Sequence, residues 1–221
     1  MAATKAEFGS GTLFKAAGTV YGVMVGSGLL VLTNVLVLAI PLLGPLAPIP
    51  LVLVGPAVVA ACYAFNRLMA GEDTGVFRDF VKAYRQNFGQ ALIAWLPYLV
   101  LLAVITANLI SLPGSNPETV AARVGLLGLA VLVSTAAVHA LLLLSRFAFR
   151  TVDIYRLSLY SLGSLKRVSL GNAGILFIAG FLLVTTTAWL LPFISGAVVY
   201  LICLNSRPLL KLVEEKFTLP A

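Results

Sequence analysis

The stretch AGTVYGVMVGSGLLVLTNVLVLAI, residues 17–40, runs for 24 residues without a charged side chain. A transmembrane helix needs about 20 apolar residues to cross roughly 30 Å of hydrocarbon, so this stretch is long enough for one crossing. It is longer than the apolar core of a cleavable signal peptide, which has about 7–15 residues. We therefore interpret residues 17–40 as the first membrane span.

The rest of the chain has the same apolar character. Of its 221 residues, 60% are hydrophobic and 10% are charged. A soluble core of this size could not hide so much apolar surface. The sequence predicts an all-α fold: a polytopic membrane helix bundle that forms a single domain over residues 1–221. Six transmembrane helices are expected, at about 17–40, 51–69, 90–112, 122–145, 173–191 and 193–205.

Lysine and arginine are distributed unevenly across this predicted bundle. If the spans cross in order, fourteen of the fifteen Lys and Arg residues lie on one side, and Arg123 alone lies on the other. Loops rich in Lys and Arg stay in the cytoplasm, so both termini are expected there. The basic clusters border apolar spans, so the net charge of +7 favours contact with anionic membrane lipids over nucleic acid.

The long connections on the cytoplasmic side are expected to contain amphipathic helices. In residues 71–89, aromatic side chains recur at helical spacing on one face, and basic side chains lie on another. Two interpretations remain open: the aromatic face packs on lipid and neighbouring spans, or it contacts a cytoplasmic partner. The candidate contact residues are Phe77, Arg78, Phe80, Lys82, Tyr84, Arg85 and Phe88.

Three glycines follow one another at steps of four in the first span: Gly18, Gly22 and Gly26. Glycine lowers helix propensity, so such a stripe is typical of a face that another helix approaches closely. The approaching helix could belong to the same chain or to another subunit, which includes a second copy in a homo-oligomer.

The segment PLLGPLAPIPLVLVGP, residues 41–56, contains five prolines and no charge. A helix that begins at Pro56 would have about 14 residues before Met69, or roughly 21 Å, which is short for a crossing. One interpretation is a broken span, whose exposed backbone near Gly55 and Pro56 could bind a solute as in transporters. The other is a continuous span with a proline kink.

Polar side chains inside the predicted spans are few. Asn34, Asn108 and His139 are the candidates for facing a solute, together with Gly55 and Pro56. A histidine inside a membrane can relay protons or contact a substrate, but it can also simply bond to a neighbouring helix. No Asp or Glu lies within a span, which argues against a proton- or sodium-coupled transporter.

The sequence contains no pattern that indicates catalysis. With one histidine, two isolated cysteines and no carboxylate inside a span, neither a nucleophile–base pair nor a metal site can be assembled. We therefore expect a protein that is not an enzyme, with no catalytic residue, no metal and no cofactor.

One block of about 40 residues resembles a known family. Gly55-Pro56-Ala57 leads to Tyr63, then come Gly71-Glu72-Asp73, a Phe77-x-x-Phe80 pair, and Asn87-Phe88-Gly89-Gln90-Ala91. This pattern is similar to that of the YesL family of bacterial membrane proteins, although Leu53-Val54 stands where the family usually has Thr before Gly-Pro. The six predicted spans also fit this family. The resemblance implies a protein of the bacterial inner membrane that is associated with ATP-dependent carbohydrate importers.

The type of role follows from what the loops lack. The inner loops do not contain the Glu-Ala-Ala…Gly pattern expected of the pore-forming subunits of such importers. The leading hypothesis is therefore an accessory or scaffolding protein that contacts importer subunits. The alternative is a small-solute (sugar) transporter or channel with a broken second span at its binding site.

Overall fold

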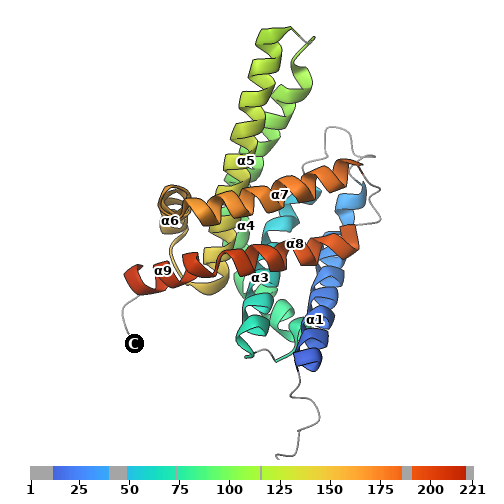
Figure 1. Cartoon of the computed structure of the whole chain (residues 1–221), viewed down its shortest axis with the longest axis vertical. Helices are drawn as coiled ribbons and strands as arrows, with labels where there is room; N and C mark the ends of the chain where they lie inside the picture. The colour runs from blue at the N-terminus through green and yellow to red at the C-terminus, as the bar shows by residue number, and fades with distance from the viewer. Residues whose placement is uncertain (1–11, 40–48, 73, 115, 186–190, 218–221) are drawn as a thin grey trace, which may run out of the picture.

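The computed structural model describes the chain except for residues 1–11, 40–48, 73, 115, 186–190 and 218–221. Over the described residues the fold is all-helical, with eight α-helices, two short 3-10 helices and no strand (Figure 1). Four helices are long and apolar enough to span a membrane, and the number rises to six if each of two bent helix pairs is one span. The chain is thus a multi-pass helical membrane protein with four to six candidate spans.

Helix α1 (Thr12–Thr33) ends earlier than the predicted first span, and the 3-10 helix η1 (Val35–Ala39) follows it. The reason lies in two polar side chains that compete for backbone carbonyls at the helix end. Thr33 Oγ1 donates to the Leu29 carbonyl at 2.8 Å, and Asn34 Nδ2 donates to the Leu30 carbonyl at 2.8 Å. Such local bonds offer the backbone an alternative to further α-helical turns.

The second candidate span is continuous over its described part. A 3-10 turn, η3 (Pro50–Leu53), leads directly into α3 (Val54–Ala70), and Leu53 and Val54 both have right-handed helical backbone angles. Together these elements extend about 33 Å, enough to cross the hydrocarbon. The interpretation in which the second helix starts only at Pro56 is therefore wrong. Residues 40–48, which hold most of the proline-rich segment, lie outside the described residues.

Helix α4 (Val76–Ser111) joins two segments that the sequence predicts as separate: the amphipathic stretch and the third span. It runs unbroken through Gly89 and Pro97. Proline lacks an amide hydrogen, so Pro97 leaves the carbonyl of Ile93, four residues earlier, without its helical partner. The hydroxyl of Tyr155 donates to that carbonyl at 2.7 Å, which replaces the missing bond.

Helix α5 (Pro117–Arg146) begins with a strong start signal. Pro117 occupies the first turn, and the Asn116 side chain accepts a hydrogen bond from the Thr119 backbone N–H at 3.1 Å. Arg123, the single basic residue predicted on the outer side, donates to the Leu112 carbonyl at the end of α4 at 2.9 Å. This contact ties the two helices together near the tip of their hairpin.

The last four helices form the two bent pairs. Helix α6 (Thr151–Ser164) meets α7 (Lys166–Thr185) at a bend of 100°, and α8 (Leu191–Asn205) continues into α9 (Arg207–Phe217) with a bend of 48°. The chain thus continues past Asn205 into a C-terminal helix, with a break at Ser206.

Helix α3 lies at the centre and packs against α1, α4, α5 and α8. Its buried face is built from small residues, because Ala57, Ala60, Ala61 and Ala64 are fully buried there. Small side chains allow neighbouring helix backbones to come close, as is usual in membrane bundles. The outer half of the α4–α5 hairpin extends beyond this packed body (Figure 1).

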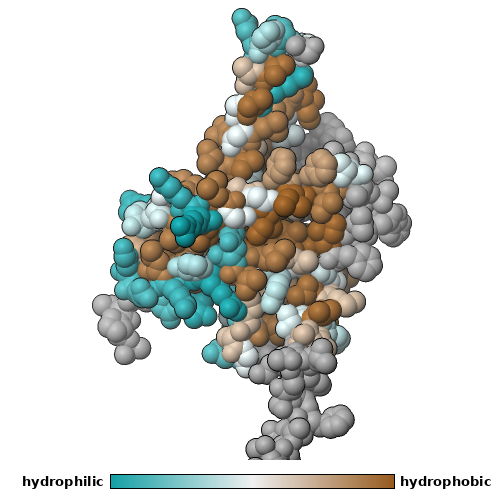
Figure 2. Space-filling view, in the orientation of Figure 1, coloured by the Kyte–Doolittle hydropathy of each residue, from teal (hydrophilic) through white to brown (hydrophobic). Residues whose placement is uncertain are grey.

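Polar surface gathers on one side of the molecule. In Figure 2 the hydrophilic residues cover the region of α6 and α9, while α7, α8 and the shaft of the α4–α5 hairpin are hydrophobic. A second, smaller polar patch marks the tip of the hairpin. The apolar surface between these two polar regions is what a bilayer would cover.

Candidate functional site

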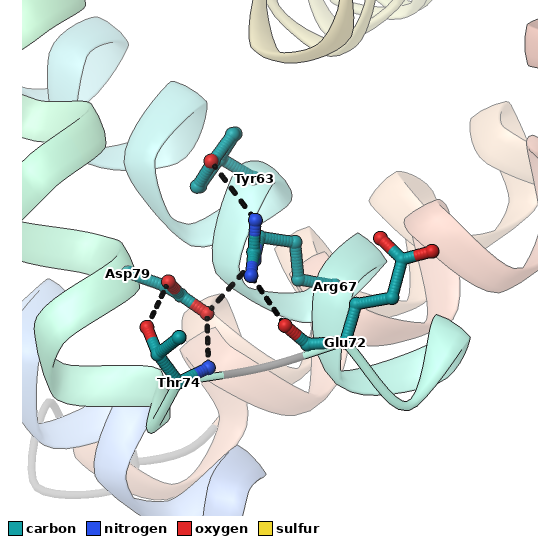
Figure 3. Close-up of polar contacts among 5 residues, drawn as sticks. All are labelled: Tyr63, Arg67, Glu72, Thr74 and Asp79. Carbon is teal, nitrogen blue, oxygen red and sulfur yellow. Dashed lines mark hydrogen bonds and ion pairs between the residues drawn. The ribbon is translucent and has the colours of Figure 1, made fainter.

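A buried carboxylate joins the end of α3 to the start of α4 (Figure 3). Asp79, in the first turn of α4, is 2% exposed. Its Oδ2 accepts from Arg67 Nε and from the Thr74 backbone N–H, both at 3.2 Å, and its Oδ1 accepts from Thr74 Oγ1 at 2.8 Å. A carboxylate is favourable at a helix N-terminus, where backbone N–H groups are free and the helix dipole is positive.

The guanidinium of Arg67 uses its remaining donors within the same cluster. It donates to the Tyr63 hydroxyl at 3.5 Å and to the carbonyl of Glu72, and it lies 5.8 Å from the centre of the Tyr63 ring. We call Tyr63, Arg67, Glu72, Thr74 and Asp79 the α3–α4 clamp. Because the charges of Arg67 and Asp79 are paired, and Thr74 and the Glu72 backbone carbonyl add hydrogen bonds to them, the clamp holds the α3–α4 turn in place.

A second polar cluster lies deep in the bundle, around His139 on α5. His139 is fully buried, and both of its ring nitrogens have partners. Nδ1 lies 2.8 Å from Ser161 Oγ on α6, and Nε2 lies 3.1 Å from Asn172 Nδ2 on α7. An amide nitrogen can only donate, so Nε2 must be the acceptor. His139 is therefore neutral, with its proton on Nδ1 and directed at Ser161.

The cluster continues from Asn172 towards the C-terminal helices. Asn172 Nδ2 also donates to Ser206 Oγ at 2.9 Å, and Asn172 Oδ1 accepts from Asn205 Nδ2 at 2.9 Å. Asn205 Nδ2 donates in addition to the Val168 carbonyl at 2.9 Å. Both hydrogens and the oxygen of the Asn172 amide are thus used. Such fully satisfied networks fix helices in one arrangement.

The same chain of bonds extends in the other direction to α4. Ser161 Oγ donates to the Ser158 carbonyl at 2.7 Å, and Ser158 Oγ lies 2.8 Å from the hydroxyl of Tyr98. We call this set the polar core; it joins α4, α5, α6, α7 and α8. Its members are Tyr98, His139, Ser158, Ser161, Asn172, Asn205 and Ser206.

Comparison with known families gives a match over the first part of the chain. Residues 18–109 match the family described as "Protein of unknown function, DUF624". This DUF624 segment spans α1 to α4 and holds the whole α3–α4 clamp, whereas Tyr98 alone of the polar core lies in it. YesL-like proteins belong to DUF624, so the resemblance is confirmed at that level, and the narrower YesL assignment stays a prediction. No curated protein and no solved structure matches the chain.

The predicted solute-facing residues do not come together in one site. Gly55 lies against the Trp95 ring, where an added Cβ would come within 2.6 Å of Trp95 Cγ, and Pro56 is buried beside it. Asn108 is exposed on α4, where its amide donates to the Val104 carbonyl at 2.8 Å. His139 belongs to the polar core.

Asn34 lies in a place of its own, at a cavity of about 170 Å³ between α1, α3 and α8. Ser195 lines the same cavity. The Asn34 Oδ1 and Ser195 Oγ atoms are buried and have no hydrogen-bond partner among the described residues.

The glycines of α1 differ in their surroundings. An added Cβ at Gly22 would come within 2.6 Å of Leu68, and one at Gly26 within 2.4 Å of Phe65, so both face α3. Gly18 is exposed, with open space around it.

The aromatic face of residues 77–88 is divided between the core and the surface. Phe80 is buried and stacks on Tyr84, which in turn meets the edge of Phe88. Phe77 is 59% exposed. The neighbouring basic side chains of Arg78, Lys82 and Arg85 are exposed as well. Packing within the chain accounts for Phe80 and Tyr84, whereas Phe77 and the basic residues lie on the surface.

Sequence reasoning missed the partners of His139. Ser158, Ser161, Asn172 and Ser206 lie outside the predicted spans, and Asn205 is the last residue of the sixth. Ser158 and Ser161, three residues apart and so on one helical face, were the available signal. What could not be seen is the 100° bend that brings α6 against α5.

Proposed function

We propose that this chain is a six-span protein of the bacterial inner membrane, with both termini in the cytoplasm. The two bent pairs, α6–α7 and α8–α9, bring the candidate spans to six. The larger polar region of Figure 2 lies over α6 and α9, at the side of the bundle and away from the hairpin tip. These helices carry Arg156, Arg207, Lys211 and Lys216. By the positive-inside rule that region is the cytoplasmic side.

Within that membrane we infer an accessory role, in which the chain binds another membrane complex and has no catalysis of its own. The observation that carries this inference is the outer half of the α4–α5 hairpin, which stands away from the bundle (Figure 1). Its large apolar side chains are exposed on both helices, among them Ile110, Val124 and Leu132.

Two glycines on the hairpin support a protein partner rather than lipid alone. Gly125 and Gly128 are exposed on α5, and nothing lies within 4 Å of a Cβ added at either position. Glycine costs about 1 kcal/mol relative to alanine inside a helix. No neighbour in the described structure offsets that cost, whereas a second helix packed closely on this face would.

The class of partner comes from the resemblance to YesL proteins. It points to subunits of an ATP-dependent carbohydrate importer. On the cytoplasmic side the exposed Phe77, with Arg78, Lys82 and Arg85, forms a second surface that such subunits could contact.

Purification of the full-length chain from its native membranes tests the accessory role. In mild detergent, importer subunits should be recovered in stoichiometric amounts. Gly125→Leu with Gly128→Leu should lower that recovery at least tenfold, while Gly174→Leu, on an equally open face of α7, should not. If the wild-type chain recovers no membrane complex, the accessory role is wrong. If the Gly125/Gly128 variant and the Gly174 variant recover the importer subunits equally, the hairpin is not the contact.

The cavity at Asn34 favours a second candidate, a small-solute transporter or channel. Two buried polar atoms without partners, Asn34 Oδ1 and Ser195 Oγ, line this otherwise apolar cavity and could bind a sugar hydroxyl. Uptake of labelled sugar into liposomes that contain only the purified chain, and loss of uptake in Asn34→Leu, would support transport. Liposomes that take up no more sugar than empty ones would contradict it.

A further inference from the structure

A separate cavity of about 460 Å³ opens where the last turns of α3 and α5 meet the start of α9. It contains no member of the α3–α4 clamp or of the polar core. Its volume is within the range of small-molecule sites, about 300–1,000 Å³. The polar side chains that line it are Asn66, Arg146, Arg207, Lys211 and Glu214.

The cavity carries excess positive charge. Three cations and one carboxylate line it, which gives 3 − 1 = +2. Arg146 lies 3.7 Å from Glu214. Arg207 and Lys211, one turn apart on the same face of α9, form no ion pair with any described residue. Two charges therefore remain available for an anion.

An independent feature of the cavity is a hydrogen-bond donor without an acceptor. The side-chain Nδ2 of Asn66, on α3, is buried and has no hydrogen-bond partner among the described residues. Buried donors are nearly always paired, because an unpaired one loses its bonds to water without replacement. A ligand oxygen in the cavity would supply the missing acceptor.

We propose that this cavity binds a phosphate group. Phosphate offers several acceptor oxygens at once, which matches donors that converge from three helices: the Asn66 amide, the two guanidinium groups and the Lys211 ammonium. The positive end of the α9 dipole, at Arg207 and Pro208, adds to the attraction. Met69 and Leu210 form an apolar wall for the organic part of the ligand.

The phosphate could belong to an anionic lipid headgroup or to a soluble phosphorylated molecule. Three probes separate these sources: dioctanoyl phosphatidylglycerol, dioctanoyl phosphatidylcholine and sn-glycerol 3-phosphate. Binding to the purified full-length chain in neutral detergent is measured by titration. The assay needs no importer, so its outcome is independent of the accessory role.

We expect saturable binding of phosphatidylglycerol or of glycerol 3-phosphate, at least tenfold tighter than of phosphatidylcholine. If glycerol 3-phosphate binds and competes, the ligand is soluble; if only the lipid binds, it is a headgroup. Arg207→Gln with Lys211→Gln should weaken binding at least tenfold. Asn66→Asp, which replaces the donor by a carboxylate of the same shape, should abolish it.

The matched control removes the same charge from the same polar side of the molecule. Arg156→Gln with Arg167→Gln changes two exposed basic residues that do not line the cavity, and it should leave binding within twofold of the wild type. The proposal is overturned if neither anionic probe binds, or if the control pair weakens binding as much as the cavity pair. Unchanged binding in folded Asn66→Asp would also overturn it.

Discussion

At the scale of single residues, the α3–α4 clamp makes a clear prediction. Arg67→Ala leaves the Asp79 carboxylate buried without its cation, which is one of the costliest changes to a buried ion pair. Because the Arg67 side chain is 29% exposed, water can replace part of the loss, so we expect a decrease in the free energy of unfolding that is clearly larger than for an exposed, unpaired arginine. Unfolding of the purified chain in mild detergent measures it.

The neighbouring Arg78 provides the control for this change. It is exposed and forms no ion pair with a described residue, so Arg78→Ala should alter the free energy of unfolding by less than about 0.5 kcal/mol. Equal effects of the two alanine substitutions would show that the clamp is not a stabilising unit.

His139 gives the second prediction at this scale. His139→Leu should lower the free energy of unfolding by about 2–4 kcal/mol, because the Ser161 hydroxyl and the Asn172 amide each lose a buried partner. His139→Leu already breaks the bond between His139 and Asn172. Adding Asn172→Ala to that variant should therefore lower the free energy of unfolding by less than Asn172→Ala does in the wild-type chain. A double-mutant cycle measures this coupling, expected at about 0.5–3 kcal/mol. Additive effects would contradict the polar core.

At the scale of helices, Pro97 in α4 offers a test with a built-in rescue. Tyr155→Phe removes the hydroxyl that bonds to the Ile93 carbonyl, so the free energy of unfolding should fall by about 1–3 kcal/mol. In a Pro97→Ala background the alanine N–H can take over that carbonyl. There the same Tyr155→Phe substitution should cost less than about 0.5 kcal/mol. An equal cost in both backgrounds would refute the replacement of the missing bond by Tyr155.

The crossing of α1 and α8 is the second test for a pair of helices. A Cβ added at Gly196 would lie 2.1 Å from Ser27 Oγ and 2.8 Å from two backbone atoms of α1, so Gly196→Ala should force the helices apart. We expect a loss of about 1–3 kcal/mol in unfolding free energy. Gly28→Ala, in open space on α1, should instead stabilise by up to about 1 kcal/mol. Destabilisation by both to the same extent would contradict the crossing.

At the scale of the whole molecule, the sequence predicts the helical class and most spans because apolar length and basic clusters are properties of single segments. Residues 122–145 show this, since they lie entirely within α5. Prediction from the sequence fails where a feature depends on contacts between two segments. The length of α4 depends on Tyr155 replacing a bond at Pro97, and the role of His139 depends on side chains of α6 and α7.

The same reason explains why the predicted solute-facing residues do not form one site. Asn34, Asn108 and His139 share polarity but lie at a cavity, on an exposed face and in the polar core, respectively. Polarity along one chain does not reveal which helix lies opposite each residue. The proposed phosphate cavity likewise needs α3, α5 and α9 together, and the residues that these three helices contribute are more than 60 positions apart from one helix to the next.

The most direct test of the membrane arrangement is labelling of single cysteines from outside intact cells. The native Cys62 and Cys203 are buried, so they should contribute little signal. With a membrane-impermeant maleimide, a cysteine at Asn116, at the hairpin tip, should react readily. Cysteines at Arg156 on α6 and Glu215 on α9 should react only after the cells are opened. Rapid labelling of those two positions in intact cells, with Asn116 protected, would reverse the orientation and contradict the account.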